Sequence, residues 1–103
     1  MKSPKHLRPG TRKWVRQVSE EFVLEEHHLR LLVLAGEAWD RCEQAREILG
    51  LESLTYLDRF GQPRARPEVS IERDSRIAFA RLLRELDLDV EPPKAPGRPP
   101  GRY

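Results

Sequence analysis

The chain has 103 residues, of which 19 are Lys or Arg, 17 are Asp or Glu and only one is Cys. This length gives room for one domain, and the single cysteine excludes an intramolecular disulfide. No apolar run is long enough for a secretory signal or a membrane span, so we expect a cytoplasmic protein with no membrane partner.

The charges are separated along the chain, although the net charge is only +2. Residues 1–18 carry six basic side chains and no acidic one, whereas residues 19–58 carry ten acidic and three basic side chains. Residues 92–103 add three cations and no acid. Basic segments at both ends favour a polyanionic partner, most often nucleic acid. Basic termini that only solubilise the protein give the same pattern, so this alternative stays open.

A short amphipathic helix is predicted over residues 12–23, with Thr11 as its N-cap. Three apolar side chains recur there at helical spacing: Trp14, Val18 and Phe22. We expect residues 1–10 to form a flexible basic arm ahead of this helix.

A long second helix is predicted over residues 25–49, because Glu25 and Glu26 suit a helix N-terminus and Gly50 suits its end. One stripe of this helix, the small-residue seam, has residues spaced four and three apart: Leu31, Ala35, Ala38, Cys42, Ala45 and Leu49. Small side chains let another helix approach closely. We therefore expect the seam, together with Trp39, to join copies of the chain in a homo-oligomer. A compact monomeric bundle is the alternative.

A short β-hairpin is predicted over residues 54–66. Residues 54–57 favour a strand, Asp58 to Gly61 favour a turn, and Pro63 restricts the second strand to an edge. Because a two-stranded hairpin is only marginally stable, we expect Tyr56 and Phe60 to contact helices or a neighbouring subunit.

A third helix is predicted from Pro67 to Leu86, since proline suits the first helical position. Four arginines lie within an arc of about 140° on it: Arg73, Arg76, Arg81 and Arg84. They form either a solvated face paired with neighbouring acids or a phosphate-contacting stripe.

The content of proline, glycine and arginine predicts a disordered basic tail over residues 91–103. The expected fold is mainly α, with the hairpin between the second and third helices inside one oligomerisation and DNA-binding domain, residues 11–90.

Signatures of catalysis or metal binding are missing. The chain has no Gly-rich phosphate loop, no CxxC or HExxH motif, and no asparagine. His27 and His28 are neighbours on a helix and point about 100° apart, so they do not bind one ion together from that face. Cys42 fits a buried packing residue better than a nucleophile. We therefore expect a protein that is not an enzyme and needs no cofactor.

Candidate DNA-contacting side chains lie in the N-terminal arm, the first helix and the third helix. They are Lys2, Lys5, Arg8, Arg12, Lys13, Arg16, Arg73, Arg76, Arg81 and Arg84. None lies in a helix-turn-helix with a short turn, so we expect contacts to the backbone of double-stranded DNA and little direct readout of bases.

The order of several features along residues 7–93 matches a known family. These features are Trp14, His28-Leu29-Arg30-Leu31-Leu32, Asp58-Arg59-Phe60-Gly61-Gln62-Pro63, Pro67, Ile71-Glu72-Arg73-Asp74, Phe79, Leu82, Leu83 and Leu86. In this order they resemble the small subunit of tailed-bacteriophage terminases. Relatives often carry glycine in place of Asp87 and asparagine in place of Arg66, so the local geometry at these two positions is expected to differ.

The resemblance implies a non-catalytic, ring-forming protein that binds phage DNA in the host-cell cytoplasm and marks it for packaging. It also implies a separate large subunit, which carries the ATPase and the nuclease, as a partner. Candidate residues for docking on that subunit are Lys94, Arg98 and Arg102 in the tail. An idle tail, or one that contacts DNA, is the alternative. Two other functions stay open for the whole protein: an adaptor that makes only protein contacts, and a nucleic-acid-binding regulator unrelated to packaging.

Overall fold

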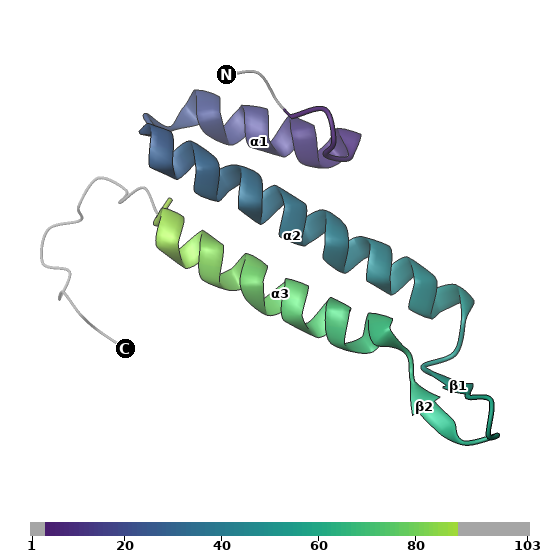
Figure 1. The fold of residues 1–103 in the computed structure, drawn as a ribbon. Helices are drawn as coiled ribbons and strands as arrows, with labels where there is room; N and C mark the ends of the chain where they lie inside the picture. Colours follow the sequence, from purple (N-terminus) through teal and green to yellow (C-terminus); the bar gives the residue numbers. More distant parts are fainter. Residues whose placement is uncertain (1–3, 89–103) are drawn as a thin grey trace, which may run out of the picture.

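The computed structural model describes residues 4–88, which form three helices and one two-stranded antiparallel sheet. In chain order the elements are α1 (Pro9–Glu21), α2 (Glu26–Leu51), β1 (Thr55–Leu57), β2 (Pro63–Ala65) and α3 (Pro67–Leu86). Figure 1 shows α1 and α3 alongside α2, with the hairpin beyond the ends of α2 and α3 and away from α1. The mainly helical fold with a hairpin between the second and third helices is confirmed. The tail predicted from residue 91 lies outside the described residues.

The core lies where the three helices meet. Its buried side chains are Leu7, Val15, Val18, Leu32 and Leu86. Val15 and Val18 are one turn apart on α1, Leu32 belongs to α2, and Leu86 ends α3. Because each helix contributes only a narrow apolar face, the three helices must pack together to bury these side chains.

The small-residue seam of α2 is covered within the chain. Ala35, Cys42 and Ala45 are buried, and the Cys42 Sγ lies 3.5 Å from a Glu72 carboxylate oxygen on α3. The hairpin reverses the chain direction so that α3 returns along α2 (Figure 1). Contrary to the sequence-based interpretation, the helix that approaches the seam at Cys42 is α3 of the same chain, not a second subunit. The other seam residues, Leu31, Ala38 and Leu49, are half-buried.

The ends of the first two helices differ from the sequence-based boundaries. α1 begins at Pro9 and not at Arg12, because proline occupies its first turn and the Thr11 side chain bonds to α2 and does not cap α1. α2 continues through Gly50 to Leu51.

The pairing of the hairpin and the end of α3 follow the sequence. β1 and β2 pair with Tyr56 opposite Arg64. α3 has the predicted bounds, and Asp87 ends it in the left-handed conformation, with φ 50° and ψ 53°. Asp87 thus takes a left-handed conformation that glycine adopts without strain, so the different helix end expected at this position is not found.

Candidate nucleic-acid interface

The segment before α1 is bound to the acidic stripe of α2, which consists of Glu37, Asp40, Glu43 and Glu47. The Asp40 carboxylate accepts a hydrogen bond from the Arg8 backbone N–H at 2.8 Å and one from the Thr11 hydroxyl at 2.5 Å. The His6 Nε2 lies 2.7 Å from a Glu37 carboxylate oxygen. A carboxylate at this place also suits the positive end of the α1 dipole. Asp40 therefore connects the start of α1 to the middle of α2.

Arg8 is held by the same stripe. Its guanidinium donates two hydrogen bonds to Glu47, at 2.8 and 3.1 Å, and lies 4.0 Å from Glu43. The hydrogen bonds from Arg8 lower the pKa of the Glu47 carboxyl below its ordinary value. Arg8, one of the candidate DNA contacts, is thus paired with carboxylates of its own chain.

The prediction of a flexible arm over residues 1–10 is wrong for residues 4–10. Leu7 is buried in the core, and Pro9 and Gly10 already belong to α1. The physical reason is tertiary: the acidic stripe of α2 attracts the basic segment, and the Leu7 side chain gains burial against Val15 and Leu32.

Three cations of α1 lie on the side of the helix away from the core. At about 100° per residue, Arg12, Lys13 and Arg16 span an arc of about 100°, whereas the buried Val15 and Val18 lie on the other side. Lys13 and Arg16 are exposed, and Arg12 is half-buried. Lys5, just before α1, is exposed as well. We call these four side chains, Lys5, Arg12, Lys13 and Arg16, the α1 cations.

The α1 cations differ from most other basic side chains in their partners. Within residues 4–88, no carboxylate lies within 4.0 Å of any of the four. Seven arginines do have such a partner there: Arg8, Arg30, Arg46, Arg64, Arg66, Arg73 and Arg76. The α1 cations therefore form a positive surface not offset by close ion pairs in this part of the chain.

The structure divides the arginine stripe of α3 into two halves. Arg73 lies 3.1 Å from Asp74, and Arg76 lies 3.3 Å from Glu72. Arg81 and Arg84 are exposed, and no carboxylate among the described residues lies within 4.0 Å of either guanidinium. The first half fits the solvated, paired face, and only the second half remains a candidate for phosphate contact.

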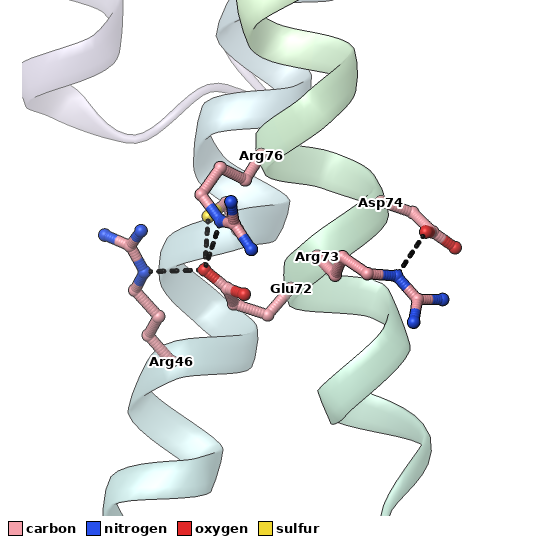
Figure 2. A network of polar contacts seen from close by, with 6 residues as sticks. Arg46, Glu72, Arg73, Asp74 and Arg76 are labelled. Atoms are coloured by element: carbon pink, nitrogen blue, oxygen red, sulfur yellow. Dashed lines mark hydrogen bonds and ion pairs between the residues drawn. The ribbon is translucent and has the colours of Figure 1, made fainter.

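Glu72 connects α2 and α3. Figure 2 shows its carboxylate between Arg46 of α2, at 3.0 Å, and Arg76 of α3, at 3.3 Å. The Cys42 Sγ lies 3.5 Å from the same carboxylate oxygen. The hydrogen bond from Arg46 is the main cause of the lowered pKa of Glu72, and Arg76 adds to it. Burial raises the pKa of the Cys42 thiol, which keeps it protonated and fits a packing role.

The lowered pKa of Glu72 makes stability depend on acid pH. A carboxyl whose folded pKa lies below its unfolded value of about 4.3 stabilises the fold above that pH, and this contribution is lost as pH falls through the folded pKa. We expect the midpoint of thermal unfolding to drop between about pH 6 and pH 3, and to drop less in Glu72→Gln. Because the pKa values of Glu47 and Asp58 are lowered too, the variant should keep part of the drop. Circular dichroism on heating measures the unfolding midpoint at each pH. If the midpoint of Glu72→Gln falls as much as that of the wild type, the role given to Glu72 is contradicted.

The hairpin turn is organised by Asp58. Its carboxylate accepts hydrogen bonds from the backbone N–H groups of Phe60 and Gln62, at 2.8 and 2.9 Å, and from Arg64 Nε at 2.9 Å. These bonds, above all the one from Gln62, lower the pKa of Asp58. Gly61 supplies the positive φ of 74° that the turn needs.

This turn presents apolar side chains to solvent. The hairpin patch consists of Leu54, Tyr56, Leu57 and Phe60, all of them exposed. Phe60 is 72% exposed, and the Arg59 guanidinium lies 5.0 Å from the centre of its ring. The sequence predicts Tyr56 and Phe60 as contact residues but not Leu54 or Leu57. Leu54 alternates with Tyr56, which is a signal for it, whereas Leu57 directly follows Tyr56 and lies on the opposite face of the strand.

An aromatic pocket joins the three helices. The Phe79 ring of α3 lies 5.1 Å from the Trp39 ring of α2 and 6.1 Å from the Trp14 ring of α1, measured between ring centres. With Arg8, Gly10, Thr11 and Glu43, these rings line a pocket of about 520 Å³. The sequence predicts Trp39 in an oligomer contact but gives no sign that the three aromatic residues lie together.

Metal binding and membrane insertion find no support in residues 4–88. This part of the chain contains no group of three or more His, Cys, Asp or Glu side chains arranged to hold an ion. None of its helices combines the length and the apolar character that a membrane crossing needs. Four candidate cations lie outside the described residues: Lys2, Lys94, Arg98 and Arg102.

Comparisons with known proteins give no relative for this chain. No family model matches it, and neither does a curated protein or a solved structure.

Proposed function

We propose that the protein is the non-catalytic small subunit of a tailed-phage terminase. In this role a homo-oligomeric ring of the chain binds double-stranded phage DNA in the host cytoplasm and regulates the large subunit during packaging. The proposal starts from the resemblance of residues 7–93 to that family. The observation that carries its DNA-binding part is the surface of the α1 cations, which have no close carboxylate among the described residues.

Phosphate contact is the chemistry that this surface supports. Arg12, Lys13 and Arg16 lie on one helical face over about 6 Å of helix length, so they can approach one DNA backbone together. The ion pairs of Arg8 offset the nearby Glu43 and Glu47, which reduces the repulsion that the acidic stripe would exert on phosphates. Contacts of this kind supply affinity and little sequence information.

Arg81 and Arg84 extend the proposal to α3. They lie on one side of that helix and are exposed, whereas Arg73 and Arg76 are paired with carboxylates. We therefore assign a secondary phosphate contact to Arg81 and Arg84 only.

The packaging role is tested with the terminase large subunit that this proposal requires as a partner. The ATPase rate of that subunit is measured with linear double-stranded DNA, with and without the full-length chain. We expect the chain to raise the rate severalfold. DNA binding without stimulation would replace this proposal by the regulator, and stimulation with no DNA binding would replace it by the adaptor.

The matched control is truncation after Val90, which removes Lys94, Arg98 and Arg102. If these tail cations dock on the large subunit, the truncated chain should lose stimulation and keep its DNA affinity. Loss of DNA affinity instead would assign the tail cations to the DNA surface.

A further inference from the structure

Two exposed apolar features lie on different parts of the molecule. One is the aromatic pocket formed by Trp14, Trp39 and Phe79, and the other is the hairpin patch. We propose that the Phe60 tip of one chain inserts into the aromatic pocket of a second copy, so that the contact between subunits is head to tail. This inference deepens the proposed oligomer by naming the surfaces that join its subunits.

The pocket has the character of a receptor for an aromatic or aliphatic side chain. Three rings from three helices form its wall, and Trp39 is partly exposed at its mouth. Gly10 adds no side chain to the wall, and nothing lies within 4 Å of where its Cβ would be. Apolar pockets that bury an aromatic anchor are the usual centres of binding energy at protein interfaces.

The hairpin tip has the character of the matching anchor. Phe60 and Leu57 are 72% and 69% exposed, and the Asp58 hydrogen bonds fix the turn that carries Phe60. A preorganised tip loses little conformational entropy on binding, which favours its use as an anchor.

The hairpin does not reach the pocket of its own chain. Along α2, Trp39 and Leu51 are separated by twelve residues, and along α3 the same number separates Pro67 from Phe79. At 1.5 Å per residue each stretch is about 18 Å long, and both are continuous helix between the pocket and the hairpin. The hairpin lies beyond the far ends of these helices (Figure 1). A hairpin tip that enters the pocket therefore comes from another copy.

Charge supports the same pairing. Glu43 lies at the pocket and has only a distant contact with Arg8, at 4.0 Å. Arg59 stands next to Phe60 and has no carboxylate within that distance in residues 4–88. When Phe60 enters the pocket, Arg59 is placed beside Glu43 of the second chain.

A contact between two different surfaces has a consequence for assembly. Each chain then offers one hairpin and one pocket, so subunits add head to tail in one direction. A ring forms when the rotation between neighbouring subunits closes, and an open filament forms when it does not, whereas a contact between two identical surfaces would stop at a dimer.

The test uses one variant on each side of the contact. Gly10→Phe fills the pocket, and Phe60→Asp makes the tip charged; Gly10→Ala and Phe60→Leu are the matched controls. By sedimentation velocity without DNA, we expect the wild type and both controls to form the oligomer. Both test variants should sediment as monomers of 12.0 kDa. Thermal unfolding verifies that each variant is folded. Oligomers that persist in either folded test variant would overturn the proposal.

Mixing the two test variants distinguishes a head-to-tail contact from other contacts. Gly10→Phe keeps an intact tip and Phe60→Asp keeps an intact pocket, so a mixture has one good contact and should form dimers of both chains but no larger species. A mixture that stays monomeric would overturn the proposal, and so would one that restores the full oligomer.

A charge exchange tests the role of Arg59. Arg59→Glu and Glu43→Arg should each weaken assembly, and the chain with both changes should recover it. No recovery would overturn this pairing. None of these assays contains DNA, and the α1 cations do not line the pocket. A failure here therefore leaves DNA binding to be judged separately by its salt dependence.

Discussion

Leu32→Ala should destabilise the protein by about 2–5 kcal/mol, the range for truncating a buried leucine. Leu32 is 0% exposed and contacts the core formed with Val15, Val18 and Leu86. In a domain of this size the loss should lower the midpoint of thermal unfolding by on the order of 10–30 °C. Differential scanning calorimetry measures it directly.

Leu34→Ala is the matched control for this substitution. It is the same change two residues further along α2, but Leu34 is 49% exposed. We expect its cost to stay below about 1 kcal/mol. Equal costs for the two variants would mean that the core does not lie where the three helices meet.

Replacing all four α1 cations by glutamine should reduce DNA affinity on the order of 10³-fold at about 0.15 M salt. The association constant varies as the salt concentration to the power −0.9 for each phosphate contact, so four contacts give a factor of this size. The change adds no bulk and touches no buried side chain except the half-buried Arg12. Fluorescence anisotropy with a labelled duplex measures the affinity.

A second quadruple variant controls for the loss of charge. Arg30, Arg46, Arg64 and Arg66 all lie within 4.0 Å of a carboxylate in the described structure, and none is a candidate DNA contact. Replacing them by glutamine removes the same total charge, and we expect a much smaller loss of affinity. If both variants lose affinity equally, the net charge of the chain and not the α1 surface governs binding.

Local signals were sufficient to predict α3 and the hairpin. Pro67 fixes the start of α3, and a residue in the left-handed conformation, Asp87, ends it. Asp58 and Gly61 lie within the turn that they organise. In each case the residues that determine the structure are neighbours in the sequence, which is why sequence patterns recover it.

Long-range contacts explain why the start of α1 was misplaced. Thr11 is a good N-cap by local rules, but Asp40, on another helix, accepts its hydroxyl hydrogen bond. The same carboxylate binds the Arg8 backbone, and Glu47 binds the Arg8 side chain. The contact between this acidic stripe and residues 6–11 exists only once α1 and α2 are packed, so no local pattern predicts it.

The candidate sites were predicted only in part, because they too depend on contacts between residues far apart in the sequence. The positive character of α1 was evident from composition, but which cations are free of carboxylates depends on the fold: Arg8 and Arg76 are paired, whereas Arg16 and Arg81 are not within residues 4–88. The aromatic pocket was not predicted, since its rings come from three helices. Helical spacing shows that a residue faces a partner and does not show which partner.

The most direct test of the account is the salt dependence of duplex binding by the wild-type chain. Its central claim is that the α1 cations, bound to no nearby carboxylate in the described structure, contact DNA phosphates. Affinity is measured between about 50 and 200 mM salt, where four contacts per chain predict a log–log slope of about −3.6 and a loss of about 150-fold. An affinity that does not change over this range would contradict the claim.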